Sequence, residues 1–522
     1  MWLNFVFFSQ SKHIQYRHAK LVIILGLCNA EFTENLRFFK NCIMDIIIKK
    51  QLSKVFDLYW EAGYIKRMDV VGQIVALLFL KSLEDFENNP SHVGFSLSAV
   101  LDDHPNFRWS MLLEEDPESA NNIYMYEILP FLCEMPLDLR LKSFPNILKI
   151  RMSDKSFSSI LKGLDDIFQV ILSDNSKVEE KTKLYGDIYE CLITFLAKSF
   201  PTTQILRAPK HLRQLICELA QVNNADTVYD PAMGTGELLV DAYEQMKIDY
   251  TVPNKLSKNI DGLPKISDND DSLFAEWSHD VCLEGDEDET VLRLLCQMNF
   301  YFHNISLVQP QFKEGNVADL LRKLRHQKIL GVIPPNKHTG DIVEQALSKL
   351  SPNGMAVLVV PSSYLYGHNK SYFDSRQNII TVYDIQAVIS LPPYEFAPQA
   401  SINTAILVVK NGKKFFNQTI WFCDLVNDGY SNDNKRVKNA SLPLPELLEA
   451  FRKKEEIHTD CIDSKQISIK DVLDNNYSLL AQQYVDSIEE KVDEMDLEVI
   501  IDRLDNLHGK IKRGIEELRK YL

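Results

Sequence analysis

One stretch of the chain combines two glycines and a carboxylate in a spacing that suits ligand binding. It reads DTVYDPAMGTGELLVDAYEQ, in which a β-type run ends at Asp230, a glycine-containing turn follows and a helical pattern begins near Glu237. In α/β proteins, ligands bind beyond the carboxyl ends of strands, where glycines let the backbone approach them closely. The stretch lacks the Gly-Lys-Ser/Thr ending of a phosphate loop and keeps only Gly234-x-Gly236 of a dinucleotide fingerprint. It is therefore either a ligand loop of another kind or an ordinary glycine turn.

A second stretch, GVIPPNKHTG (residues 331–340), places two consecutive prolines directly after a short apolar run. Because proline locks φ and donates no backbone hydrogen bond, Pro334 and Pro335 predict a rigid loop at the end of a buried strand. The side chain before them, Ile333, has no hydrogen-bonding group, and the side chain after them, Asn336, is a polar amide. A loop of this rigidity suggests that the positions of its backbone groups matter for function.

A third stretch, VCLEGDEDETVLRLLCQMNFYFHNI (residues 281–305), carries an acid between a short β-type run and a helical pattern. Glu287 offers two acceptor oxygens, which suits a pair of vicinal hydroxyl groups. Taken alone, such an acid is usually solvated at the surface. Its position directly before RLLCQMNFYFHNI favours a binding role instead.

Together these stretches resemble S-adenosylmethionine-dependent amino-methyltransferases, which carry a DPAxGTG loop followed by a strand–acid–helix unit. The resemblance implies a Rossmann-like α/β sheet domain and S-adenosylmethionine as the cofactor. It also implies that Glu287 ends the second strand and accepts hydrogen bonds from the ribose hydroxyls. The remaining cofactor-binding residues that it implies in the loop are Asp230, Pro231, Ala232, Gly234, Thr235, Gly236 and Glu237.

A longer resemblance covers nearly everything after Met44. The run from Ser351 to Asn411 looks very like the distal half of the modification subunit of type I restriction–modification systems, an N6-adenine DNA methyltransferase. The helical region with VVGQIVALLFLKSLEDFE is similar to the N-terminal domain of that subunit. NNYSLLAQQYVDS (residues 475–487) resembles the segment that leads to its C-terminal helices.

That family has an Asn-Pro-Pro-Phe motif after its fourth strand, where a flipped-out adenine is bound. The Asn oxygen and the first Pro carbonyl accept hydrogen bonds from the exocyclic amine, and the ring stacks on the base. Ile333-Pro334-Pro335-Asn336 occupies this place, so the prolines match while the acceptor and the ring are missing. Losing an acceptor aimed at developing charge costs about 10²–10³ in rate, and losing a stacking ring costs about 1–3 kcal/mol. The resemblance thus predicts a degenerate catalytic motif with little or no adenine methylation.

The stretch Leu391-Pro392-Pro393-Tyr394 is a weaker candidate for the same role. Tyr394 could stack on a base, but the stretch also lacks a polar first residue. It matches a later segment of the family that normally coexists with the catalytic motif.

Other positions depart from the family as well. Asn316 stands where an aspartate usually faces the adenine of the cofactor, and it can still hydrogen-bond but carries no charge. Leu206, Ala208 and Pro209 correspond to a Phe-x-Thr-Pro segment that helps hold the amino-acid end of the cofactor, and they match it mainly in the proline. The aspartate usual before the fourth strand is Lys328 here. The residues of the cofactor loop therefore match the family pattern better than the residues that would meet the adenine.

The elements that would position these residues fall into four regions of the chain. Residues 1–43 have no clear period, and one hypothesis is that they are an extension before a natural start at Met44. Residues 44–200 show helical apolar patterns and predict a helical N-terminal domain. In residues 201–437, β-type runs alternate with helical stretches, which indicates a layered α/β domain with a mostly parallel sheet; residues 252–278 look like a polar surface insertion. Residues 438–522 are expected to be helical.

The β-type runs that predict strands are Asp226–Asp230, Ile329–Ile333, Met355–Val360, Asp384–Leu391 and Thr404–Val409. The last stretch of the chain, residues 500–522, carries apolar residues at spacings of three and four. That spacing predicts a helix that packs either on its own domain or on a partner subunit.

Composition excludes several classes of protein. With 522 residues, of which 45% are hydrophobic and 25% charged, the chain suits a soluble protein of two to four domains. No apolar run approaches the roughly 18 residues needed to span a membrane. Nine cysteines without a CxxC pair, and no histidine cluster at metal-ligand spacing, favour reduced thiols in a cytoplasmic protein with no metal site.

Two functions remain open. In the first, the chain is an N6-adenine DNA methyltransferase subunit that works with a specificity subunit, a restriction subunit and a second methylase copy. In the second, it is a catalytically degenerate paralogue (a pseudoenzyme) that binds DNA or partner subunits, with S-adenosylmethionine as a structural or regulatory ligand. Because the net charge is −16, DNA would have to meet a local basic surface or another subunit. One candidate is the basic run Arg322, Lys323, Arg325 and Lys328, although a solvated helix face is the favoured interpretation of this run.

Overall fold

The computed structural model describes residues 48–63, 67–89, 100–134, 152–171, 178–197, 207–256, 282–305, 325–336, 338–397, 400–412, 418–438 and 442–485. The expected N-terminal extension, most of the polar insertion and the expected helix at 500–522 lie outside these residues. The chain divides into two compact units. The first consists of Met1–Pro201 with Met233–Glu314, and the second of Thr202–Ala232 with Gly315–Leu522. Among the described helices, none is both long and apolar enough to cross a membrane.

The described part of the first unit is mainly helical, as its apolar patterns predict. Its elements are an initial helix at 48–61, α3 (Arg67–Phe86), α5 (Val100–Asp103), η1 (Pro105–Phe107), α6 (Trp109–Glu114), α7 (Pro117–Ile123), the π-helical turn η2 (Tyr124–Ile128), α8 (Leu129–Glu134), α10 (Asp154–Ile171), α11 (Val178–Ala197), α13 (Glu237–Leu256), β2 (Cys282–Gly285) and α15 (Thr290–Phe302). Local signals set some of the ends. At α7, the Asp116 side chain accepts hydrogen bonds from the amides of Glu118 and Ser119, which caps the helix.

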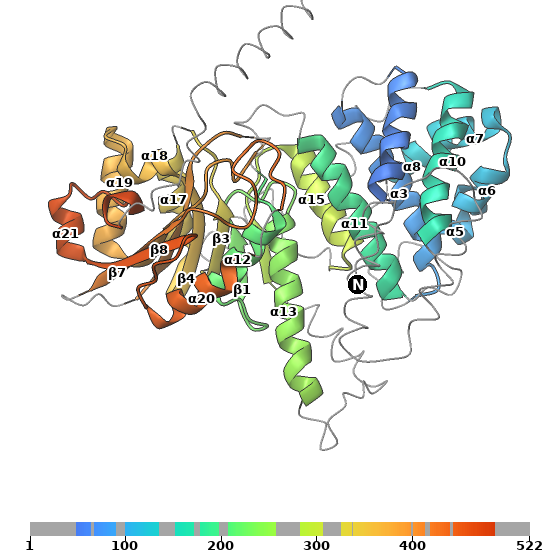
Figure 1. The fold of residues 1–522 in the computed structure, drawn as a ribbon. Helices are drawn as coiled ribbons and strands as arrows, with labels where there is room; N and C mark the ends of the chain where they lie inside the picture. The colour runs from blue at the N-terminus through green and yellow to red at the C-terminus, as the bar shows by residue number, and fades with distance from the viewer. Residues whose placement is uncertain are drawn as a thin grey trace, which may run out of the picture. The chain divides into compact units, whose positions relative to one another are not determined.

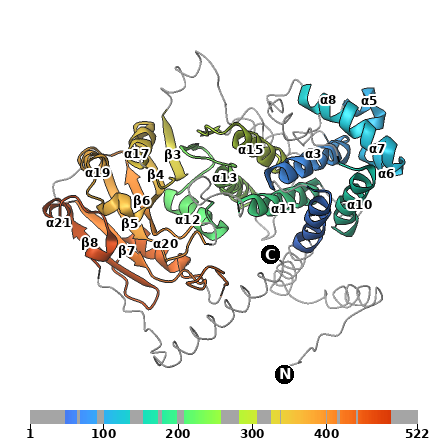
Figure 2. The same ribbon diagram turned by 90° about the horizontal axis from the view of Figure 1, so that it is seen from above.

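Helix α15 lies beside α11 (Figure 2), and buried polar contacts hold it to α3 and α11. The hydroxyls of Ser82 and Tyr301 lie 2.9 Å apart, and the Tyr189 hydroxyl donates to the Leu295 carbonyl. The ring of Phe79 meets the ring of Tyr301 edge to face at 5.0 Å. These contacts fix the helix that faces the glycine turn.

The second unit carries a sheet with helices on both of its faces (Figure 1). Its elements are α12 (Lys210–Ala220), β1 (Thr227–Asp230), β3 (His326–Val332), α17 (Thr339–Ser348), β4 (Leu350–Pro361), α18 (Ser362–Tyr366), α19 (Lys370–Val382), β5 (Asp384–Ser390), β6 (Thr404–Lys410), β7 (Thr419–Leu425), α20 (Leu444–Lys453), β8 (Ile462–Ser468), α21 (Ile469–Asp474) and η4 (Ala481–Gln483).

Within this unit the strands follow the order β1-β3-β4-β6-β5-β7-β8. β1, β3 and β4 are parallel; β6 lies antiparallel between β4 and β5; β7 is parallel to β5; and β8 is antiparallel to β7. Strands β1, β3, β4, β5 and β7 therefore run in one direction. Their carboxyl ends share one edge of the sheet, called the carboxyl edge below.

The two faces of the sheet bury different helices. Along β4, Ala356, Leu358 and Val360 join a core with α17, α18 and α19, and residues after β8 complete it. On the other face α12 packs against β3 and β4, and the Trp421 ring of β7 meets Phe451 of α20 edge to face at 5.9 Å. Alternate residues of β4 are thus buried on opposite sides, which explains why this strand is a continuous apolar run.

All five predicted strands are present, with ends that differ by a few residues. β4 begins at Leu350 rather than Met355 and β3 at His326 rather than Ile329. Two strands were missed. β7 was not predicted, and β8 lies inside the region expected to be helical. β8 reads IDSKQIS, and this edge strand is mostly polar beyond its first residues, so its pairing with β7 rather than an apolar period defines it.

Candidate functional site

The loop after β1 begins with a buried carboxylate. Asp230 is 2% exposed, and its Oδ1 accepts a hydrogen bond of 2.9 Å from the Ala232 amide. Beside it, Gly331 of β3 lets the loop approach closely, because an added Cβ would meet the Pro231 ring at 3.0 Å. The start of the loop is therefore shaped both by its own carboxylate and by a glycine of the next strand.

The two glycines of the loop have backbone conformations that other residues rarely adopt. Gly234 has φ +55° and Gly236 has φ +78°. A Cβ on Gly236 would collide with the Cys296 sulfur of α15, whereas a Cβ on Gly234 would meet nothing within 4 Å. The first glycine thus faces open space while the second lies directly on α15.

Asn299 of α15 holds the peptide between these glycines. Its Nδ2 donates a hydrogen bond of 2.9 Å to the Thr235 carbonyl, and the side chain is 2% exposed. The amide at the other end of that peptide, Gly236 N–H, donates to the Met233 carbonyl at 2.8 Å. Sequence reasoning missed Asn299, although an amide inside the apolar run CQMNFYF is a signal that could have found it.

Glu287 lies directly beside the loop. Its side chain accepts hydrogen bonds from the backbone amides of Gly234 and Glu289, the latter at 2.9 Å. Burial outweighs these bonds and raises the pKa of Glu287. The Met233 amide also donates to the Asp286 carbonyl at 3.1 Å. The sequence placed Glu287 at the end of the second strand, but β2 ends at Gly285, two residues earlier.

The prolines after β3 form a tight turn whose polar groups are mostly used within the turn. Ile333 is fully buried in the core beneath α17 and α18, and its amide donates to Val359 O at 2.8 Å. The carbonyl of Pro334 already accepts a hydrogen bond of 3.0 Å from the Thr339 hydroxyl. The Asn336 Oδ1 accepts from the amide of His338 at 2.8 Å.

The segment before α12 is held from within its own helix. Ala208 is 3% exposed, and its carbonyl accepts a hydrogen bond of 2.9 Å from Arg213. Pro209 stands at the N-cap position of α12. Leu206 and Asn316 lie outside the described residues, as do Arg322 and Lys323. Lys328 belongs to a local ion pair near the start of β3, with its Nζ 3.7 Å from Asp226 Oδ2.

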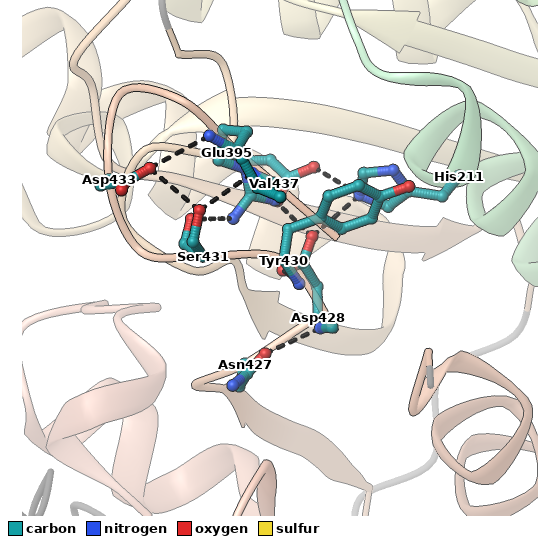
Figure 3. A network of polar contacts seen from close by, with 10 residues as sticks. His211, Glu395, Asn427, Asp428, Tyr430, Ser431, Asp433 and Val437 are labelled. Carbon is teal, nitrogen blue, oxygen red and sulfur yellow. Dashed lines mark hydrogen bonds and ion pairs between the residues drawn. The ribbon is translucent and has the colours of Figure 1, made fainter. Parts of the chain in front are cut away.

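A buried charged network joins α12 to two loops at the carboxyl edge (Figure 3). His211 Nε2 lies 2.9 Å from Asp428 Oδ2 and 3.0 Å from Glu395 Oε1. Arg436 contacts both carboxylates, at 2.8 Å for Glu395 Oε2. The Tyr430 ring stacks on the His211 imidazole at 4.6 Å. Sequence reasoning missed this network because its members are far apart in the chain.

Burial and hydrogen bonding shift the pKa values of the network in opposite directions. Burial alone would lower the pKa of His211, but hydrogen bonds to Asp428 and Glu395 outweigh it and raise that pKa to about 9. Burial would raise the pKa of Asp428, but His211 and Arg436 lower it to about 2. His211, Glu395 and Asp428 stand close enough together to share a metal ion. His211 and Arg436 place two basic side chains against the two carboxyl groups. Burial raises the pKa of Glu395.

Known proteins show the same architecture. The N-6 DNA Methylase family matches residues 180–319 and 310–493. A type I modification methyltransferase subunit from Streptococcus thermophilus superposes with a TM-score of 0.58 at 16% identity, covering 85% of this chain and all of that one. A modification subunit of a type I restriction enzyme from Vibrio vulnificus superposes with a TM-score of 0.56 at 17% identity, covering 81% of this chain and 93% of that one.

Curated relatives are similar over shorter spans. The type I restriction enzyme MjaVIII methylase subunit of Methanocaldococcus jannaschii is 20% identical over 66% of this chain and 60% of its own length. The type II restriction enzyme and methyltransferase RM.BcgI of Heyndrickxia coagulans is 24% identical over 52% of this chain and 41% of its own. The chain thus spans about half the length of these relatives. Since the family match covers more than half of the chain, and the α/β sheet and glycine loop agree with it, the protein belongs to the N-6 DNA methylase family.

Proposed function

We propose that this protein is the N6-adenine DNA methyltransferase-type subunit of a type I restriction–modification-like system and binds S-adenosylmethionine. The observation that carries the proposal is the glycine loop after β1, in which the half-buried Glu287 accepts a hydrogen bond from the Gly234 amide and a Cβ on Gly234 would meet no atom within 4 Å. In this proposal Asp230, Pro231, Ala232, Gly234, Thr235, Gly236 and Glu237 surround the cofactor. Ala208 and Pro209 meet its amino-acid end, and Glu287 accepts hydrogen bonds from its ribose. S-adenosylmethionine would supply the methyl group.

The partners follow from the same proposal. DNA is the substrate, a specificity subunit reads its sequence, and a restriction subunit and a second methylase copy complete the assembly. The protein would act in the cytoplasm. Because the chain carries a net charge of −16, the specificity subunit is expected to supply much of the positive surface that binds phosphates.

A second candidate function is supported by the turn after β3. There the residue that should accept from the adenine amine is the buried Ile333, and the carbonyl of Pro334 is partly engaged by Thr339. With one acceptor missing and the other shared, the chain would be a pseudoenzyme that binds S-adenosylmethionine and partners but transfers little or no methyl.

Calorimetric titration of S-adenosylmethionine tests the shared part of both functions. We expect the wild-type chain to bind and Asp230→Ala to lose binding. Asp230→Asn is the matched control for folding, because its side-chain oxygen can still accept from the Ala232 amide. If the wild-type chain does not bind, with or without a specificity subunit, a cofactor role for the loop is wrong. If all three proteins bind equally, Asp230 has no part in the site.

A further inference from the structure

Four charged side chains, almost completely buried, come from three separate segments of the second unit (Figure 3). His211 lies in the first turn of α12, Glu395 follows β5, and Asp428 and Arg436 follow β7. Their side chains are 10%, 1%, 2% and 8% exposed, respectively. The contacts therefore tie the start of α12 to both loops away from water.

Such a network is a costly way to stabilise a fold. Removing charges from water is expensive, and a buried ion pair often contributes no more than well-packed apolar side chains would. The backbone around it is strained as well, since Tyr394 has φ +66° and Arg436 has φ +47°. Strain of this kind persists only where the surrounding structure enforces it, and it clusters at functional sites. Both features favour a role in positioning over a role in stability.

The place of the network in the sheet indicates what it positions. β5 and β7 are parallel, and both run in the direction of β1, so the loops after them lie at the carboxyl edge where Asp230 ends β1. His211 follows Pro209 by two residues, and the Arg213 side chain holds the Ala208 carbonyl. Arg213 thus holds the Ala208 carbonyl, while the network holds His211, two residues after Pro209.

We infer that His211, Glu395, Asp428 and Arg436 form a clamp that positions the Ala208–Pro209 segment for the amino-acid end of S-adenosylmethionine. The inference rests on the proposed function, because it needs this segment to bind the cofactor. The four side chains are positioning residues: they hold the backbone that meets the ligand. Tyr430 covers the clamp through its stacking on His211.

The test removes the link to α12 without leaving an unpaired charge. The double variant His211→Leu with Glu395→Leu deletes one cation and one anion, and the Asp428–Arg436 pair remains. The matched control is Asp226→Leu with Lys328→Leu, which deletes a partly buried ion pair at the opposite edge of the same sheet. Both variants lose an ion pair, but only the first alters the segment before α12.

Binding of two ligands distinguishes a loss of positioning from a general loss of structure. S-adenosylmethionine has the amino-acid end, and 5′-methylthioadenosine has the same nucleoside without it. We expect the clamp variant to bind S-adenosylmethionine about tenfold to a hundredfold more weakly, the loss typical of one hydrogen bond to a charged group. Its affinity for 5′-methylthioadenosine should stay within about twofold of wild type. The control should bind both ligands as the wild type does.

Other outcomes overturn the inference in distinguishable ways. Equal weakening for both ligands would mean that the network only stabilises the fold, and no weakening would mean that it does not position the segment. Absence of S-adenosylmethionine binding by the wild-type chain would remove the proposed function and the clamp with it. If the double variant does not fold, Tyr430→Leu replaces it, with a smaller loss confined to S-adenosylmethionine as the expected result.

Discussion

At the scale of single residues, the proposed methyl transfer depends on the turn after β3. An exocyclic amine becomes positively charged as it attacks a methyl group, so acceptors aimed at it lower the barrier. Ile333 offers none, and the Pro334 carbonyl shares its lone pairs with Thr339. The Asn336 side chain caps the turn through the His338 amide. These polar groups therefore form hydrogen bonds that stabilise the turn itself.

The double change Ile333→Asn with Asn336→Phe tests whether the rest of the site is intact. We expect adenine methylation, measured as tritium transfer to DNA with a specificity subunit present, to rise by at least about 10² over wild type. The change also buries an amide where Ile333 packs, so the free energy of unfolding should fall by about 1–3 kcal/mol. Ile333→Leu with Asn336→Phe is the control without the acceptor. If methylation does not exceed that of this control, the site has also lost catalytic groups outside the turn.

Asn299 allows a second prediction at this scale. Asn299→Leu removes the donor to the Thr235 carbonyl, so the loop should loosen and S-adenosylmethionine affinity should fall about tenfold, or roughly 1.4 kcal/mol. Asn121→Leu is the matched control, because Asn121 is equally buried and also donates to a backbone carbonyl, that of Met152, at 3.1 Å. It should lower thermal stability without changing affinity. An unchanged affinity in Asn299→Leu would contradict the role of this amide.

At the scale of elements, the glycine loop depends on how closely it lies on α15. Gly236 combines a positive φ with contact to Cys296, whereas Gly234 combines a positive φ with open space. The two positions therefore separate backbone strain from steric contact. α15 is itself held by Ser82, which hydrogen-bonds to Tyr301, and by Tyr189, which donates to the Leu295 carbonyl, so α15 is not free to move away from the loop.

Substituting each glycine by alanine should reveal this difference in urea unfolding. Gly234→Ala is expected to lower the free energy of unfolding by about 1 kcal/mol, the cost of the left-handed backbone alone. Gly236→Ala should cost about 2 kcal/mol more because of the overlap with the Cys296 sulfur. Adding Cys296→Ala should recover part of that extra cost. Equal costs at the two glycines would mean that α15 does not constrain the loop.

At the scale of the whole molecule, the buried network links stability to pH. The pKa of His211 is raised to about 9 in the folded protein, against about 6.5 in the unfolded chain. Its contribution is therefore fully present below pH 6.5 and is lost as the pH rises through 9. Lys454 acts in the opposite direction, since burial lowers its pKa to about 8 and the folded state gains stability as this amine deprotonates.

Urea unfolding at pH 6.5 and pH 9.5 should expose the His211 contribution as a difference between two proteins. The wild-type chain should lose up to roughly 3 kcal/mol more over this interval than His211→Leu with Glu395→Leu, which keeps Lys454 but lacks the imidazole. Because both proteins keep Lys454, its opposing contribution cancels when the two changes in unfolding free energy are subtracted. Parallel pH profiles for the two proteins would show that His211 does not carry a raised pKa.

Much of the architecture could be predicted from the sequence, because it rests on local patterns. The apolar runs of β1, β3, β4, β5 and β6 predict strands, and the glycine turn marks the carboxyl end of β1. Family resemblance located the prolines and Glu287 for the same reason, since each lies within a short continuous motif. β8 was missed because its residues are polar and its pairing partner β7 lies nearly 40 residues earlier.

What the sequence by itself determined is therefore the set of elements and the chemistry of short motifs, which need only neighbours in the chain. The tertiary structure alone decided which distant side chains meet. Asn299 reaches the Thr235 carbonyl across 64 positions, and His211 reaches Asp428 across 217. It also decided that Ile333 faces the apolar core. Burial and charge pairing depend on all elements packed together, and no local pattern encodes them.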